Sequence, residues 1–327
     1  MSTETFLDVK DLKKYFEAGR PGIFSKDTRL VHAVDGVDLQ LRRSEVIALV
    51  GESGCGKSTL ALLLMGLEDP THGTIKFEGR DITHLNDHQR KDLRRKIQMV
   101  FQDPYESLNP TQTIEEIVTE PLMVHGVANG PERVERVKKA LEDSGLKPAE
   151  VYMHRYPHEL SGGQRQRVVI AAALVLEPEI ILADEPVSML DVSIRAEIIN
   201  LLAELRITRK IAVIFITHDL GSVGFFADRV AVMYLGRVVE IGTMLEVLEN
   251  PQHPYTKALL SVIPVPNPRL RHERIILEGE TPNPIDLPSG CRFHPRCPVA
   301  METCKINDPL PMHLTKTHSS FCHLSGI

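Results

Sequence analysis

The chain has 327 residues, a length that suits one large α/β domain with an appendage. Its 38 basic and 44 acidic residues give a formal net charge of −6, and no block of Lys and Arg indicates a tail that binds nucleic acid. The start lacks a signal-peptide pattern, and the longest apolar run, Val168 to Leu176, is far shorter than the roughly 20 residues that cross a bilayer, so we expect membrane association only through a partner.

Short apolar runs alternate with helical patterns along the first 250 residues. Four of these runs have the length of strands: Val46 to Val50, Ile97 to Phe101, Ile180 to Ala183 and Ile211 to Ile216. Strands that are apolar at nearly every position suit a sheet that helices cover on both faces. After Asp191, apolar residues spaced for one helical face predict a helix. The fold class is therefore predicted to be α/β with a mainly parallel sheet.

The pattern changes twice. Between Gln102 and Gln164 it predicts helices, such as Glu132 to Ser144, and no strong strand. By about Asn250 the alternation ends, and residues 264–327 hold ten of the 22 prolines and four of the five cysteines. Such a segment cannot easily bury a core of its own, so we expect it to need docking or a staple.

A phosphate-binding loop follows the first predicted strand. Residues 51–58 read Gly-Glu-Ser-Gly-Cys-Gly-Lys-Ser and fit G-x-x-x-x-G-K-[ST]. The glycines leave room for backbone N–H groups to approach phosphate oxygens, Lys57 would pair with the β- and γ-phosphates, and Ser58 would give its hydroxyl to Mg²⁺. The predicted nucleotide-binding set is Gly51, Ser53, Gly54, Cys55, Gly56, Lys57, Ser58 and Thr59.

An acidic pair ends the third apolar run. Asp184 stands where a carboxylate can hold the magnesium shell, and Glu185 stands where it can orient and polarise an attacking water. Two further motifs are Leu160-Ser161-Gly162-Gly163-Gln164 and Ile216-Thr217-His218-Asp219. The paired glycines allow close backbone approach, and a helix predicted from Arg165 to Leu176 would present its positive end to a phosphate.

This ordered set of motifs resembles the nucleotide-binding subunit of an ATP-binding cassette (ABC) transporter over roughly residues 5–265. The resemblance implies a P-loop NTPase core of the RecA-like type, an inserted helical subdomain at about residues 103–170 and an N-terminal antiparallel β subdomain, which together form a domain over residues 1–250. It also implies catalytic roles for Glu185, for Gln102 as a sensor of Mg²⁺ or water, and for His218 beside the γ-phosphate.

The resemblance further implies that hydrolysis requires two cassettes. The residues that would cap the ATP of the facing subunit are Ser161, Gly162, Gly163 and Gln164. Asp191 falls in a segment that resembles the family's D-loop. An aromatic side chain upstream should stack on adenine; Phe16 matches the family's position, and Tyr15 is the alternative because the insertion from Glu17 to Arg29 could shift the register.

The segments His253 to Leu260 and Gly290 to Pro298 resemble the C-terminal extension of oligopeptide/dipeptide-type ABC ATPases, here residues 251–327. Its cysteines, Cys291, Cys297, Cys304 and Cys322, could ligate a [4Fe–4S] cluster or tetrahedral Zn²⁺. The paired C-x-x-C motifs usual for structural zinc are absent, and Cys297-Pro298 is similar to the Cys-Pro of ferredoxin-type ligation. Both observations favour an iron–sulfur cluster over zinc or free thiols. The resemblance to peptide importers also implies an iron–sulfur cluster. Four nearby histidines could serve as spare ligands, but the favoured interpretation is that they are surface residues: His294, His313, His318 and His323.

The hypothesis is an ATPase subunit, on the cytoplasmic face of the inner membrane, that powers import of di- or oligopeptides. The implied partners are a paralogous second ATPase subunit, two transmembrane permease subunits and an extracytoplasmic solute-binding protein, with no nucleic acid. Import of nickel, glycosides or another solute stays open. A soluble ABC ATPase that acts on nucleic acid or ribosomes usually has two cassettes, a coiled-coil insertion or basic arms, and this sequence shows none of them. A small-molecule kinase would not need the segment from Ser161 to Gln164. The intact motifs around Lys57 and Glu185 argue against a non-hydrolysing redox sensor.

Overall fold

A computed structural model describes residues 5–18, 29–224, 226–263 and 274–326. Most of the insertion predicted between Glu17 and Arg29 lies outside the described residues. So does the start of the proline-rich segment, at residues 264–273.

The larger sheet has eight strands in the order β11-β12-β10-β9-β3-β8-β7-β6. Their bounds are β3 (Val46–Val50), β6 (Ile97–Val100), β7 (Ile180–Asp184), β8 (Ala212–Thr217), β9 (Arg229–Tyr234), β10 (Arg237–Thr243), β11 (Met312–His313) and β12 (Ser319–Ser320). The strands from β9 to β6 are parallel, which confirms the prediction from the four apolar runs. β10, β12 and β11 add antiparallel pairs, so the whole sheet is mixed.

A second, antiparallel sheet has the order β2-β1-β4-β5. Its strands are β1 (Thr5–Ala18), β2 (Arg29–Arg42), β4 (His72–Phe77) and β5 (Arg80–Asp81). Strand β3 shows how the two sheets share the protein core. Its side chains alternate, so Ile47 and Leu49 pack with the antiparallel sheet and helix α1 (Lys57–Leu64), whereas Val46, Ala48 and Val50 pack on the helices of the other face. Both faces of the parallel strands are therefore buried.

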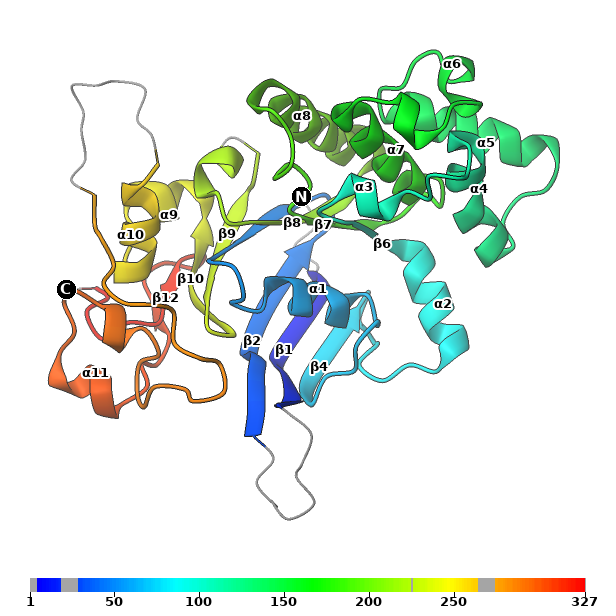
Figure 1. The fold of residues 1–327 in the computed structure, drawn as a ribbon. Coiled ribbons are helices and arrows are strands. Elements are labelled where there is room, and N and C mark those ends of the chain that lie inside the picture. Colours follow the sequence, from blue (N-terminus) through cyan, green and yellow to red (C-terminus); the bar gives the residue numbers. More distant parts are fainter. Residues whose placement is uncertain (1–4, 19–28, 225, 264–273, 327) are drawn as a thin grey trace.

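Between β6 and β7 the chain forms helices and no strand. They are α3 (Pro104–Ser107), α4 (Ile114–His125), α5 (Pro131–Asp143), α6 (Glu150–Met153) and α7 (Gly162–Leu174), with a 3₁₀ turn at Pro157–Glu159. Figure 1 shows them gathered at the opposite end of the molecule from the C-terminal segment. The other helices are α2 (Asp87–Lys96), α8 (Val192–Arg209), α9 (Met244–Glu249), α10 (Pro254–Ser261) and α11 (Glu302–Ile306), with 3₁₀ turns at Leu220–Val223 and His294–Arg296. None of the described helices is long and apolar enough to span a membrane.

Helix α7 begins at Gly162, earlier than the predicted start at Arg165. Ser161 is the N-cap residue, and its hydroxyl accepts a hydrogen bond from the backbone N–H of Gln164. The Gln164 side chain in turn accepts from the N–H of Ser161 at 3.0 Å, which completes a capping box. The two glycines are therefore part of the first turn of the helix.

The C-terminal segment docks on the larger sheet. Ser319 and Ser320 of β12 pair with Ile241 and Glu240 of β10. Phe293 is 1 % exposed, and its ring centroid lies 5.2 Å from that of Tyr234 on β9. Buried side chains of this segment join the core of the preceding residues, which corresponds to docking, one of the two expected alternatives.

Candidate functional site

The phosphate loop joins β3 to α1. Gly54 and Gly56 have positive φ values of 78° and 104°. A Cβ atom at Gly56 would lie 2.0 Å from the backbone oxygen of Ala33, so no side chain fits there. α1 begins at Lys57, directly after this turn. The first backbone N–H groups of α1 are therefore available to an anion.

A cavity of about 790 Å³ lies beside this loop. Residues of the loop and of α1 that line it are Ser53, Gly54, Gly56, Lys57, Ser58 and Thr59. Four predicted residues from other parts of the chain also line it: Phe16, Gln102, Glu185 and His218. The fold thus gathers around one cavity side chains that are more than two hundred positions apart in the sequence.

Glu185 is the centre of a polar cluster at the ends of three neighbouring strands. It follows β7, Gln102 lies just beyond the end of β6, and His218 follows β8. Nδ1 of His218 lies 3.1 Å from Oε2 of Glu185, and Nε2 of Gln102 donates to the same oxygen at 3.3 Å. Glu185 has a φ of 45°, a left-handed conformation that is unusual for a residue with a side chain. A carboxylate held in this way can accept a proton from a water in the cavity.

The side-chain oxygens of Asp184 and Ser58 form a separate pair that could coordinate a metal ion. Burial raises the pKa of the Asp184 carboxyl; a hydrogen bond from Ser58 opposes this rise, and the charge of Glu185 adds to it. A nearby cation would favour the ionised carboxylate. Carboxylate and hydroxyl oxygens are hard ligands of the kind that Mg²⁺ prefers, so the two residues fit that ion.

Lys57 folds back onto the loop. Its Nζ donates to the backbone oxygens of Gly51 at 2.8 Å and Glu52 at 2.9 Å, and the residue is 5 % exposed. The Nζ also lies 3.8 Å from Sγ of Cys55, whose pKa is raised by burial, so none of these contacts gives the buried ammonium group a compensating negative charge. The amine is therefore placed to bind an anion that enters the cavity.

The adjacent aromatic residues Tyr15 and Phe16 point to different surroundings. Neighbouring side chains in a strand point to opposite faces, so only one of the two can face the cavity. Phe16 lines the cavity. The Tyr15 hydroxyl donates to Asp35 at 2.5 Å, and burial together with this carboxylate raises the pKa of Tyr15 to about 12.

Other predicted residues do not line this cavity. Gly51 packs against β9, where a Cβ would lie 2.2 Å from the backbone oxygen of Met233, and the Cys55 side chain is buried in the core. Asp191 is exposed at the start of α8. Ser161 to Gln164 form the start of α7 and do not face the cavity of their own chain.

Five residues that line the cavity were missed by the sequence prediction, two of which are Val31 and Ala33 of β2. Glu52 lines the cavity, and so do Leu259 and Pro284 from the C-terminal extension. The backbone oxygen of Pro284 also accepts a hydrogen bond from the N–H of His32 on β2 at 3.0 Å. No sequence signal pointed to the two extension residues, because their position depends on how the extension docks.

The four cysteines of the extension do not form a metal site in the structure. In the described ranges, no group of three or more His, Cys, Asp or Glu side chains is placed to hold a metal ion. The thiols nevertheless lie in one region. The N–H of Cys291 donates to the backbone oxygen of Cys304 at 2.8 Å. Burial, and then the nearby Cys304, Cys322 and Cys297 groups, raise the pKa of Cys291 to about 11.

The histidines predicted as spare ligands all have protein partners. Nδ1 of His294 lies 2.9 Å from the Cys291 backbone oxygen, Nδ1 of His313 lies 2.8 Å from the Ser319 hydroxyl, and Nε2 of His323 lies 3.0 Å from the Asn307 backbone oxygen. The interpretation of His318 as a surface residue is wrong. It is 1 % exposed, and its Nε2 lies 2.8 Å from a carboxylate oxygen of Glu240.

Comparison with known families gives two matches. Residues 34–188 match the family described as ABC transporter. Residues 239–304 match the family described as oligopeptide/dipeptide transporter, C-terminal region. The two matches cover the phosphate loop and three of the four cysteines.

Individual relatives match over nearly the whole chain. The oligopeptide transport ATP-binding protein AppF of Bacillus subtilis is 49% identical over 324 residues, which is 98% of each chain. The dipeptide transport ATP-binding protein DppF of Haemophilus influenzae is 51% identical over 304 residues, 93% of this chain and 91% of the relative. Among solved structures, an ATP-binding cassette dimer in a post-hydrolysis state with ADP and phosphate is 32% identical, with a TM-score of 0.64 over 73% of this chain and 98% of that chain.

Proposed function

Because this chain belongs to the ATP-binding subunits of oligopeptide/dipeptide ABC transporters, we propose that it hydrolyses ATP to drive the import of di- and oligopeptides through partner membrane subunits. The chain is an ATPase with the cassette fold. One observation carries the proposal: beside the phosphate loop, the Glu185 carboxylate lies within hydrogen-bonding distance of both Gln102 and His218. The relatives named for peptide transport support the cargo.

In this proposal the phosphate loop and α1 bind the triphosphate. The N–H groups at the start of α1 bind phosphate oxygens, and the Lys57 amine exchanges its backbone carbonyls for the β- and γ-phosphates. Bound Mg²⁺ would neutralise phosphate charge, and the Ser58 hydroxyl would hold it directly with Asp184 in its outer shell. Phe16 supplies the face on which adenine stacks.

Glu185 then activates water. Its carboxylate orients the water and accepts its proton as the γ-phosphate bond breaks. The Gln102 amide and the His218 ring both contact Oε2 of this carboxylate, and both residues line the same cavity. In this proposal His218 contacts the γ-phosphate, and Gln102 senses the ion or the water.

We place the protein on the cytoplasmic face of the membrane, with a second cassette that completes each ATP site. That second cassette is a paralogous subunit, and the segment from Ser161 to Gln164 caps its nucleotide, with Asp191 at the contact between the two. Two permease subunits form the pathway and an extracytoplasmic binding protein supplies the peptide.

Uptake by the assembled transporter tests the cargo. The chain, its partner ATPase and both permeases are placed in liposomes, with ATP on the cassette side and the binding protein on the other side. These liposomes should accumulate a labelled dipeptide. Lys57→Ala should abolish uptake, because it removes the amine that binds the phosphates. Uptake of nickel or a glycoside in place of any peptide would contradict the proposed cargo.

We further propose that Cys291, Cys297, Cys304 and Cys322 hold a [4Fe–4S] cluster, with Zn²⁺ as the alternative. The support is a set of four thiols in one region of a segment with little regular structure, where the backbone N–H of Cys291 donates to the backbone oxygen of Cys304. Closing the thiols around metal would need local rearrangement, because their present arrangement does not meet the requirements of a metal site. Four protein ligands leave no open position, so the group would be a structural staple or a redox sensor.

Metal analysis should decide this point. Protein purified without oxygen should be brown and contain about four iron atoms per chain. A Ser replacement at Cys291, Cys297, Cys304 or Cys322 should remove the colour and make residues after about 280 sensitive to protease. Cys55→Ser is the control, because that thiol is buried beside the phosphate loop. Stoichiometric zinc without iron would overturn the cluster, and four variants with unchanged tails would overturn the staple as well.

A further inference from the structure

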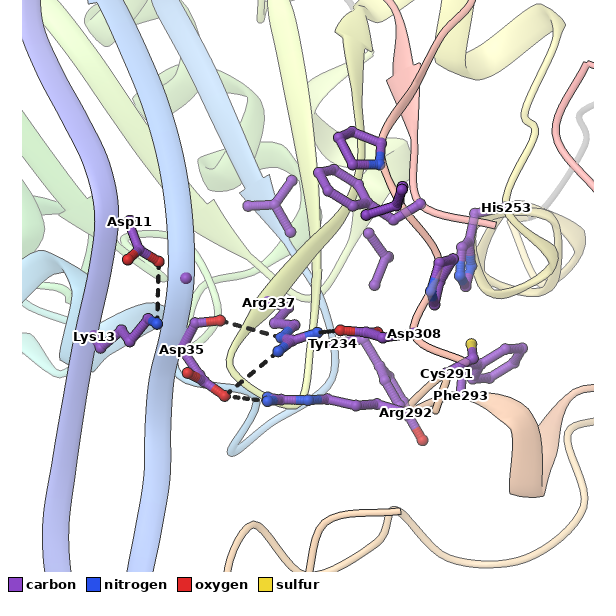
Figure 2. Close-up of a pocket in the computed structure, with 17 residues that line it drawn as sticks. Asp11, Lys13, Asp35, Tyr234, Arg237, His253, Cys291, Arg292, Phe293 and Asp308 are labelled. Carbon is purple, nitrogen blue, oxygen red and sulfur yellow. Dashed lines mark hydrogen bonds and ion pairs between the residues drawn. The ribbon is translucent and has the colours of Figure 1, made fainter. Parts of the chain in front are cut away.

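The C-terminal extension is joined to the catalytic part of the chain by charge pairs, of which the pair between Arg292 and Asp35 is buried. Figure 2 shows Arg292 of the extension and Arg237 of β10 converging on Asp35 of β2. Arg237 also pairs with Asp308 of the extension. These groups line a cavity of about 250 Å³, and the two guanidinium charges of Arg237 and Arg292 are balanced by the carboxylates of Asp35 and Asp308. The pairs anchor the segment that begins at Cys291.

Four residues beyond Arg292, the same segment reaches the phosphate loop. Nη1 of Arg296 donates to Oε2 of Glu52 at 2.8 Å, and Nη2 donates to Oε1 at 3.2 Å, so the contact is bidentate. The Thr281 hydroxyl donates to the same carboxylate at 2.6 Å. The backbone N–H of Glu52 donates to the Tyr255 hydroxyl at 2.9 Å. Three residues of the extension therefore hold one residue of the loop.

Glu52 is an unusual residue for its surroundings, because it lines the cavity that receives phosphate groups. A bare carboxylate there would repel them. Partial burial alone would raise the pKa of Glu52, but hydrogen bonds from Arg296 and Thr281, with the charges of Arg296 and Lys57, bring it below the ordinary value. The group is thus ionised at neutral pH, and its charge has to be balanced.

Arg296 is placed to balance that charge. Its side chain is 10 % exposed and that of Glu52 is 29 % exposed, so water and salt screen the pair only partly. The other cation near Glu52 is Lys57, whose amine donates to the Glu52 backbone oxygen at 2.9 Å. If Arg296 were absent, the Glu52 carboxylate would compete with phosphate for Lys57.

We infer that Arg296 is a positioning residue for nucleotide binding: it neutralises Glu52 and holds the phosphate loop, so that ATP affinity depends on the docked extension. This inference rests on the proposed function, in which ATP binds at residues 51–59. It gives the extension a role at the nucleotide site of its own chain, in addition to any role of its cysteines.

Binding of MgATP to the full-length chain tests the inference. Arg296→Gln should weaken binding about tenfold or more, because an unbalanced and partly buried charge acts strongly over a few ångströms. Arg296→Lys should retain much of the affinity. Glu52→Gln should bind MgATP more tightly than the natural chain, because Arg296 is then free to attract phosphate. The double variant Glu52→Gln/Arg296→Gln should recover most of the affinity lost in Arg296→Gln.

Lys305→Gln is the matched control. It removes one positive charge from the extension at an exposed ion pair with Glu302, and it should leave binding unchanged. In the assembled ATPase, Arg296→Gln should raise KM for ATP far more than it lowers kcat, whereas general damage to the fold would lower both the melting temperature and kcat.

Two results would overturn the inference. One is normal MgATP affinity in Arg296→Gln. The other is a loss that persists undiminished in the double variant, since Arg296 would then act without reference to the Glu52 charge. Failure of the natural chain to bind MgATP would instead contradict the proposed function itself, and this inference with it.

Discussion

Replacement of Glu185 by Gln should slow ATP turnover by the assembled transporter at least about a hundredfold, the loss typical when a general base is removed. Gln has the size and shape of Glu but cannot accept a proton from water. Its amide can still bond with Gln102 and His218, which lie 3.3 Å and 3.1 Å from Oε2 of Glu185, so the cavity should keep its form. Lys57 and Ser58 are untouched, and MgATP affinity should therefore stay near that of the natural chain. Steady-state hydrolysis and nucleotide binding, measured on the same preparation, check both parts.

A second glutamate provides the control. Glu177 is exposed, precedes β7 and pairs with Lys139, so Glu177→Gln removes a similar charge at the other end of the strand. It should leave turnover unchanged. In the proposed mechanism hydrolysis releases the two cassettes, so the Glu185→Gln complex should also remain closed on ATP. Near-normal ATPase activity in Glu185→Gln would reject this residue as the base.

The parallel strands could be predicted from the sequence for a simple physical reason. Strands covered on both faces need apolar side chains at every position, and Val46–Val50 is buried throughout. Gln102, Glu185 and His218 could be predicted to meet because the carboxyl ends of neighbouring parallel strands lie at the same edge of a sheet. The contacts that these three side chains actually make could not be predicted, because they depend on side-chain conformations.

The sequence also contains a local signal for the start of α7. The Ser161-x-x-Gln164 pattern is a capping box and could have placed the helix start at Gly162. The sequence leaves open whether Tyr15 or Phe16 faces the nucleotide cavity. Alternation in a strand shows that only one of the two side chains does so, but not which one. In the structure Phe16 lines the cavity, whereas the Tyr15 hydroxyl donates to Asp35 on the neighbouring strand.

The contact between Arg296 and Glu52 had no signal in the sequence. The two residues are 244 positions apart, and their meeting depends on the docking of the extension at Asp35. Long-range ion pairs of this kind follow from tertiary packing and not from any local pattern. The same holds for Leu259 and Pro284, which complete the wall of the nucleotide cavity.

The proposed requirement for a facing cassette predicts a large loss of ATP turnover when the start of α7 is changed. Gly162 is the first residue of α7, and a Cβ there would meet the Tyr105 hydroxyl at 3.4 Å and Leu190 Cδ2 at 3.7 Å, which are ordinary contacts. An Asp at the first turn of a helix is also favourable to the helix. Gly162→Asp should therefore fold normally and bind MgATP normally as an isolated chain.

In the assembled ATPase the same change should reduce turnover at least about a hundredfold, the loss expected when a site built to stabilise negative charge is disrupted. The added carboxylate would stand where the start of α7 approaches the phosphates bound by the facing cassette, and like charges would repel. Gly162→Ala separates bulk from charge and should retain far more activity. If Gly162→Asp lowered MgATP binding by the isolated chain, or if a proven monomer hydrolysed ATP at the full rate, the segment from Ser161 to Gln164 would act within its own chain and the two-cassette mechanism would be wrong.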